Sequence, residues 1–204
     1  SASASGETIR GNLGATLKLV AEALKTPAFD AGEYDKLVRA SLASVESSRT
    51  DPQAIAGRAF NRHLKPFPPG DVRETPTFDE QVARLKAAKL DDAKAFHAKF
   101  YGASNAELAI VGDFDPAEAK LLAAQLFGDW KSREPWARVP DPFQATKPAA
   151  ETIETPDKAN AVLVGGMAIP MSDRSADYAA MLIAERILGG APESRLFTVV
   201  RQQK

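Results

Sequence analysis

The side chains that could carry catalytic chemistry are few in this sequence of 204 residues. It contains two histidines, His63 and His97, and no cysteine. A protein zinc site normally takes its ligands from histidine, cysteine and carboxylate side chains at short helical spacings, and no His-x-x-Glu-His or related spacing occurs here. No Gly-x-Ser-x-Gly nucleophile motif occurs either. The sequence therefore predicts no catalytic residue and no metal site in this chain, and it places both histidines on helix surfaces.

Two further patterns suggest chemistry at first sight. Asp113 and Asp115 flank Phe114, but no calcium-binding loop of alternating oxygen ligands follows them. Capping of the helix that starts after Asp115-Pro116 explains both carboxylates more simply. Gly165-Gly166 is not followed by the lysine and helix start of a phosphate-binding loop, so a bulge or a close backbone approach is the better interpretation.

Arg195 and Arg201 lie close together near the end of the chain, after Gly189-Gly190. An arginine offers a planar fork of donors that can hold a backbone carbonyl or a carboxylate of a substrate. The simpler interpretation is a solvated helix face, because arginine is mostly an exposed residue.

Composition limits the partners and the compartment. Basic and acidic side chains number 26 and 27 and are interspersed, which gives a net charge of −1 and no basic stripe for nucleic acid. No apolar run is long enough to span a bilayer, so we expect no membrane insertion, and no signal peptide is evident. The lack of cysteine fits an oxidising compartment such as the bacterial periplasm as well as the cytoplasm, and the localisation stays open.

The elements that must position these residues are mostly helical. Apolar residues recur at helical spacing, and start signals precede several of the runs: Asp30, Asp51-Pro52, Asp91 and Asp115-Pro116. Helices are predicted around residues 17–24, 34–45, 52–64, 78–85, 93–100, 116–126 and 175–188, with a last one starting near Ser194. A proline-rich loop over residues 65–77 interrupts the series.

Short strands are predicted between the helices. Residues 7–12 alternate weakly, residues 108–111 (LAIV) form a continuous apolar run, and residues 151–155 and 159–169 follow a proline-rich stretch. The mixture predicts an α+β fold with a mixed sheet and several packed helices. Residues 131–150 are predicted to link two units, at 1–130 and 151–204.

Several stretches together resemble the insulinase/pitrilysin family of zinc metallopeptidases, which is built from repeated half-domains. The family has a segment in which Phe-Tyr, an Asn, an apolar strand and Gly-Asp are followed by a helix that ends at Phe-Gly-x-Trp. The corresponding stretches of this chain, in the same order, are Phe100-Tyr101, Asn105, residues 108–111, Gly112-Asp113 and Phe127 to Trp130. Further similarity lies at Asp51-Pro52, at residues 188–190 and at residues 194–201. The resemblance implies the half-domain fold of the insulinase and mitochondrial-processing-peptidase type. Residues 1–130 would be the later part of one half-domain and residues 151–204 the beginning of a second.

The departures from the family pattern imply a non-catalytic half-domain. The helix that usually supplies the third zinc ligand, a glutamate, has Ser41 and Ser44 at the corresponding positions and only Glu46 nearby. The resemblance thus implies no cofactor in this chain, with zinc on the catalytic half of the parent protein or on a partner subunit. Peptide substrate and that catalytic half-domain are the expected partners.

One functional residue follows from the resemblance. The family's non-catalytic half uses an arginine, with a tyrosine about seven residues later, to bind substrate and stabilise the oxyanion. Arg201 matches the arginine, which makes it the expected substrate-binding residue.

Three functions remain open from the sequence. The chain is an inactive half-domain of a zinc metallopeptidase that closes the chamber and binds the peptide substrate, or a structural and assembly protein of the same fold without a protease role. A third hypothesis is a module that captures extended peptides at an exposed strand edge.

Overall fold

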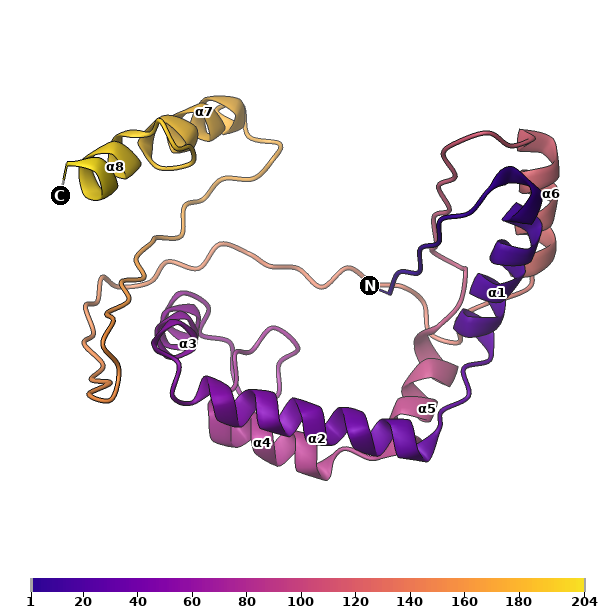
Figure 1. The fold of residues 1–204 in the computed structure, drawn as a ribbon, viewed down its shortest axis with the longest axis horizontal. Coiled ribbons are helices and arrows are strands. Elements are labelled where there is room, and N and C mark those ends of the chain that lie inside the picture. Colours follow the sequence, from indigo (N-terminus) through magenta and orange to yellow (C-terminus); the bar gives the residue numbers. More distant parts are fainter. Residues whose placement is uncertain (1, 204) are drawn as a thin grey trace.

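A computed structural model describes residues 2–203, and all its regular elements are helices (Figure 1). A short 3₁₀ turn, η1 (Arg10–Asn12), precedes the first helix, and a π-helical turn, η2 (Thr198–Gln202), follows the last. The helices are α1 (Leu13–Lys25), α2 (Ala31–Ser48), α3 (Pro52–Leu64), α4 (Phe78–Ala87), α5 (Leu90–Phe100), α6 (Pro116–Phe127), α7 (Tyr178–Leu188) and α8 (Arg195–Phe197). Among the described residues, no helix has the length and apolar character needed to cross a membrane.

Side-chain caps explain where most of these helices begin. Asp30 accepts a hydrogen bond from the Glu33 amide, and Asp51 accepts from the first amides of α3, which begins at Pro52. Asp115 caps α6 in the same way. These amides have no partner within the helix, so each carboxylate satisfies donors that would otherwise depend on water.

The start of α5 differs from the prediction, and α4 begins with a cap that the sequence analysis did not identify. Helix α5 begins at Leu90, and Asp92 rather than Asp91 accepts the bond from the Lys89 amide. Helix α4 has a full capping box, in which Thr77 accepts from the Glu80 amide and the Glu80 carboxylate accepts from the Thr77 amide.

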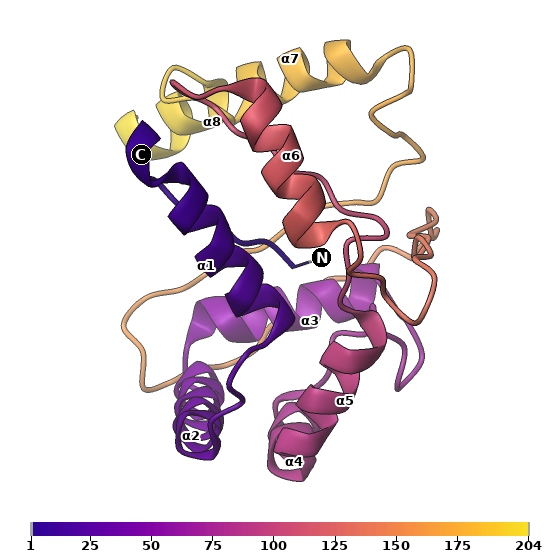
Figure 2. The same cartoon turned by 90° about the vertical axis from the view of Figure 1, so that its right-hand side faces the viewer.

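The helices form an open arc of pairs (Figures 1 and 2). Helix α1 packs against α6, and α2 packs against α4. Helices α7 and α8 contact each other and stand apart from the rest, at the end of a long extended segment (Figure 1).

The predicted α+β fold with a mixed sheet is wrong, because residues 2–203 contain no strand. Residues 108–111, 151–155 and 159–169 are not helical, as expected, but no backbone ladder joins them to one another. Residues 10–12 of the predicted first strand form η1 instead. A β-strand is defined by bonds to a neighbouring strand. The local sequence pattern explains why these residues are not helical. Formation of a sheet depends in addition on a neighbouring strand, and the described chain does not supply one.

The chain buries little apolar surface. Its accessible area is 15,893 Å², whereas a compact protein of this mass exposes about 9,300 Å². The buried apolar residues among those described are Leu17, Ala21, Val45 and Ala119, all on the α1–α6 and α2–α4 pairs. Large side chains such as Val111 and Leu163 are 97% exposed. An apolar surface of this extent is typical of a chain that packs against further protein.

The capping box of α4 yields a stability prediction. Thr77→Ala removes the hydroxyl that accepts from the Glu80 amide, so we expect the free energy of unfolding to fall by about 1 kcal/mol in urea titrations followed by helical circular dichroism. Thr152→Ala, in an exposed extended segment, is the matched control and should leave the transition unchanged. Equal effects of the two substitutions would contradict the role of the cap.

Candidate functional site

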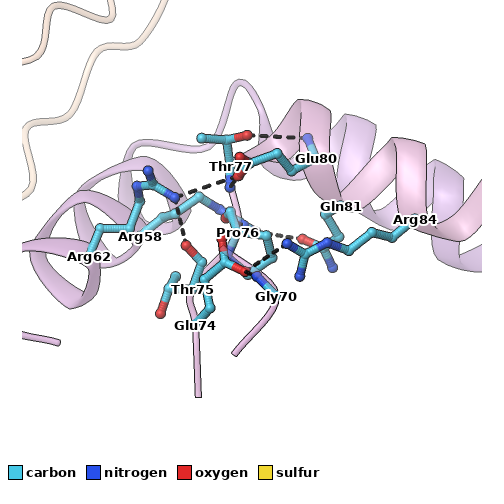
Figure 3. Close-up of polar contacts among 10 residues, drawn as sticks. All are labelled: Arg58, Arg62, Gly70, Glu74, Thr75, Pro76, Thr77, Glu80, Gln81 and Arg84. Atoms are coloured by element: carbon cyan, nitrogen blue, oxygen red, sulfur yellow. Dashed lines mark hydrogen bonds and ion pairs between the residues drawn. The ribbon is translucent and has the colours of Figure 1, made fainter. Parts of the chain in front are cut away.

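The densest polar cluster of the molecule lies where α3, the proline-rich loop (residues 65–77) and α4 meet (Figure 3). Arg58 of α3 is its centre. Its guanidinium donates to the Pro76 carbonyl and, at 2.8 Å, to Oε1 of Gln81, and it lies 4.1 Å from the centre of the Phe78 ring. Burial, together with the positive charge of Arg62, lowers the pKa of Arg58. Arg58 therefore ties the end of the loop to both helices.

Arg62 lies one turn further along α3 and repeats this contact. It donates to the Thr75 carbonyl at 2.7 Å, and its nearest carboxylate oxygen, on Glu80, is 3.7 Å away (Figure 3). The amide of Thr77 donates to Glu80 and lowers the pKa of that carboxyl. Because Arg58 and Arg62 are four residues apart, both point from one face of α3 at successive carbonyls of the loop.

Glu74 ties the turn at Gly70, in the middle of the loop, to α4. Its side chain is 5% exposed and accepts from Arg84 at 2.7 Å and from the Gly70 amide at 2.8 Å. Arg84, and then the Gly70 amide, lower the pKa of Glu74. Gly70 has φ +86° in a turn closed by the bond from the Asp71 amide to the Pro68 carbonyl, a conformation that favours glycine at this position.

A second cluster fastens the loop to the segment after α6. Arg73 donates to both carboxylate oxygens of Asp71, at 2.8 and 2.7 Å, and lies 4.1 Å from the centre of the Phe67 ring. Its third nitrogen donates to the Pro140 carbonyl at 2.5 Å. The hydrogen bonds from Arg73 lower the pKa of Asp71 from 3.8 to about 2.

Two neighbouring contacts extend this attachment. Lys65 pairs with Asp141 at 2.5 Å, and Nε2 of His63 lies 2.8 Å from the Lys147 carbonyl. Residues 140–147 are thus held against the end of α3 and the proline-rich loop.

Two open grooves adjoin the first cluster. One, of about 440 Å³, lies between α2 and α4 and is lined by Ala40, Ser41, Ser44, Val45, Gln81 and Leu85. The other, of about 470 Å³, lies between α3 and the loop, and Gln81 lines both. Neither groove is lined by a histidine, and the one carboxylate among the lining residues, Glu74 of the second groove, is already paired with Arg84, so neither offers a set of metal ligands or an acid–base pair.

The structure gives ordinary roles to most residues that the sequence singled out. Asp115 is a helix cap, as predicted, but Asp113 instead pairs with Arg10 at 2.6 Å. His63 is exposed, and Nε2 of His97 lies 2.7 Å from the Leu24 carbonyl. Gly166 makes a close approach, since a Cβ there would lie 2.8 Å from Cζ of Phe60.

The helix that would carry a third zinc ligand does not fit a metal. Ser41 and Ser44 line the groove between α2 and α4, and Glu46 pairs with Nε of Arg49 at 2.8 Å. Within residues 2–203, no group of three or more histidine, cysteine or carboxylate side chains could hold a metal ion.

Arg201 lies in η2, exposed to solvent, and its guanidinium carbon is 5.2 Å from the centre of the Phe197 ring. No ion pair of the described residues involves it. Its assignment to substrate stays a prediction.

The residues that sequence reasoning missed are the arginines of the two clusters, Arg58, Arg62 and Arg73. The spacing of Arg58 and Arg62 on one helix face, followed by a loop with four prolines, was the available signal. All three donate to backbone carbonyls of this chain. The clusters therefore position the backbone, and they offer no nucleophile.

Comparisons with known proteins identify the family of this chain. The family model described as "Peptidase M16 inactive domain" matches residues 87–204, more than half of the chain. The chain therefore belongs to the peptidase M16 inactive domain family, which confirms the resemblance drawn from the sequence. The description implies that the chain has no catalytic zinc site. A search of curated proteins found no match.

A solved structure has a similar fold. It is the crystal structure of a peptidase M16 inactive domain from Pseudomonas fluorescens, with a TM-score of 0.70 and 24% sequence identity. The match covers 93% of this chain and 44% of that one, so this chain spans less than half the length of its solved neighbour.

The position of Arg58 predicts how the loop is held. Arg58→Met keeps an apolar side chain over Phe78 but removes the donors to Pro76 and Gln81, so trypsin should cleave the loop after Arg73 about tenfold faster. Arg39→Met, at an exposed arginine of α2, is the matched control. Equal acceleration in both variants would show that Arg58 does not hold the loop.

The low pKa of Asp71 predicts the pH range of the second cluster. A carboxyl whose pKa is lower in the folded chain stabilises it above the unfolded value of 3.8, and this contribution is lost as pH falls through about 2. A titration of the Asp71 carboxyl carbon by NMR should show its midpoint near 2, and Arg73→Gln should return that midpoint toward 3.8. An unchanged midpoint in the variant would exclude Arg73 as the cause.

Proposed function

We propose that this chain is the inactive half of a zinc metallopeptidase. It closes the chamber over a peptide substrate and contributes to binding that substrate, while zinc and catalysis lie on another half-domain or chain. The observation that carries this proposal is the match of residues 87–204 to the inactive domain of the M16 family. We further propose that residues 1–130 and 151–204 belong to two successive half-domains joined by residues 131–150.

The exposed apolar surface supports the pairing part of the proposal. The described chain exposes far more area than a compact protein of its mass, and α7 has no buried residue although most of its side chains are apolar. Large apolar faces are typical of obligate interfaces, which resemble a divided domain core. A catalytic domain that covers these faces would complete the core that this chain lacks.

The setting of Arg201 supports the binding part. Its guanidinium is accessible, and the Phe197 ring on which it lies limits its motion. A planar fork held in this way suits a backbone carbonyl or a carboxylate of a bound peptide. Zinc on the catalytic half would supply Lewis-acid chemistry, to which Arg201 adds a positioned positive charge.

A reconstitution experiment tests the proposal. The chain is combined with an M16 catalytic domain that carries His-x-x-Glu-His and is encoded beside it, and cleavage of a fluorogenic peptide is followed together with zinc content. We expect the chain alone to bind no stoichiometric zinc and cleave nothing, and the complex to be active. Arg201→Gln should lower kcat/KM of the complex about tenfold or more, because a charge-assisted hydrogen bond is lost.

Arg186→Gln, at an exposed arginine on the neighbouring helix α7, is the matched control and should leave kcat/KM unchanged. One tightly held zinc per isolated chain would overturn the assignment of the metal to another domain. Association without any gain in cleavage would favour the structural and assembly function.

A further inference from the structure

Residues 130–147, here called the brace, run as an extended segment from the end of α5 to α3 (Figure 1). The brace connects two parts of the helical arc, because α1 packs against α6 in one part and α2 packs against α4 in the other. The principal packing contacts of the described helices lie within these two pairs. The angle between the pairs therefore depends on the segments that connect them.

The first end of the brace is bonded to the residues that end and follow α5. The Ala103 amide donates to the Trp130 carbonyl at 2.7 Å, so the backbones are in contact at this point. The Glu134 amide donates to the Lys99 carbonyl at 3.1 Å, and the side chains of the same two residues form an ion pair at 3.4 Å. The two stretches thus run antiparallel, as neighbouring strands do.

Gly102 makes this close approach possible. A Cβ there would lie 2.6 Å from the carbonyl carbon of Lys131 and 2.7 Å from Cα of Ser132. Both are backbone atoms, which cannot turn aside as the end of a long side chain can. The Ser132 amide also donates to Oγ of Ser104 at 3.2 Å. A methyl group at residue 102 would therefore displace this end of the brace.

The far end of the brace is held by two side chains of the proline-rich loop. Arg73 donates to the Pro140 carbonyl at 2.5 Å while Asp71 accepts from its other nitrogens, and the Arg73 side chain is 28% exposed. Lys65 pairs with Asp141, and both of these side chains are more than half exposed. Water and salt weaken an exposed ion pair, so Arg73 is the stronger anchor.

Residues 135–139, between the two ends, make no hydrogen bond or ion pair with the residues that the structure describes. An extended chain from Glu134 to Pro140 covers at most about 20 Å, which limits the separation of the two ends while both are held. Without the two contacts of the loop, the next hold is the bond between His63 and the Lys147 carbonyl. The free connection would then reach about 40 Å.

We propose that the brace fixes the curvature of the helical arc by limiting the distance between α6 and α3. Release of either end lets the α1–α6 pair move relative to α3, while each helix pair stays intact. The inference goes beyond the proposed function, and it holds whether or not residues 131–150 also join two half-domains.

Spin labels can measure this curvature, because the chain has no cysteine other than those introduced for labelling. Labels at Gln53→Cys in α3 and Lys120→Cys in α6, both exposed positions, report the distance across the arc by double electron–electron resonance. Labels at Arg39→Cys in α2 and Lys86→Cys in α4 are the matched pair within one part of the arc. We expect one narrow distance distribution for each pair in the otherwise unchanged chain.

Two sets of substitutions release the ends of the brace. Arg73→Gln combined with Lys65→Gln frees the far end, and Gly102→Ala frees the first end. Each should widen the α3–α6 distribution at least about twofold, because the free connection about doubles in reach. Arg133→Gln, at an exposed arginine of the brace, is the matched control and should leave the distribution unchanged. The α2–α4 distribution and the helical circular dichroism should stay the same in every variant.

A third variant changes the length of the brace without touching its anchors. An insertion of about ten glycine and serine residues after Ala137 adds a flexible stretch between the two ends. It should widen the α3–α6 distribution as much as the release of either end does.

Three results would overturn the proposal. An unchanged α3–α6 distribution in the insertion variant would show that contacts other than the brace hold the arc. Equal widening by Arg133→Gln would exclude the anchors as the cause. Widening in both label pairs would show that the substitutions loosen the chain as a whole.

Discussion

The contact between the Arg58 guanidinium and the Pro76 carbonyl sets the arrangement of the central part of this chain. A partly buried positive charge is costly unless its donors find acceptors. Here the two terminal nitrogens of Arg58 donate to a loop carbonyl and a glutamine, and the guanidinium lies over an aromatic face, while its Nε has no hydrogen-bond partner. The loop is thereby fixed between α3 and α4, and α4 in turn packs on α2. In a chain with so few buried apolar residues, such polar contacts do much of the positioning that a core would otherwise provide.

Sequence reasoning succeeded where structure is local. The starts of α3 and α6 follow from Asp51-Pro52 and Asp115-Pro116, since a cap and a proline act within one turn of the helix. It failed where the structure of a segment depends on contacts with residues far away in the sequence. Residues 108–111 have the pattern of a buried strand, yet Val111 is 97% exposed because no neighbouring strand lies within the described chain.

The polar clusters were missed for a related reason. Arg58 and Arg73 have no motif of their own, and their partners, Pro76 and Pro140, contribute only backbone carbonyls. A carbonyl is present in every residue, so its use as an acceptor leaves no mark in the sequence. The family membership, by contrast, could be predicted from the sequence, because the order and the spacing of several weak motifs along the chain together form a specific pattern.

The close approach of Gly166 to Phe60 also sets how far Arg201 can travel. Between that contact and the start of α7, the connecting residues 167–177 fold back in successive turns closed by the amides of Met171, Ser175 and Tyr178. A freely jointed linker of this length would span about 18 Å, and the turns shorten it. These turns therefore limit how far the α7–α8 pair, and Arg201 beyond it, can lie from the contact between Gly166 and Phe60.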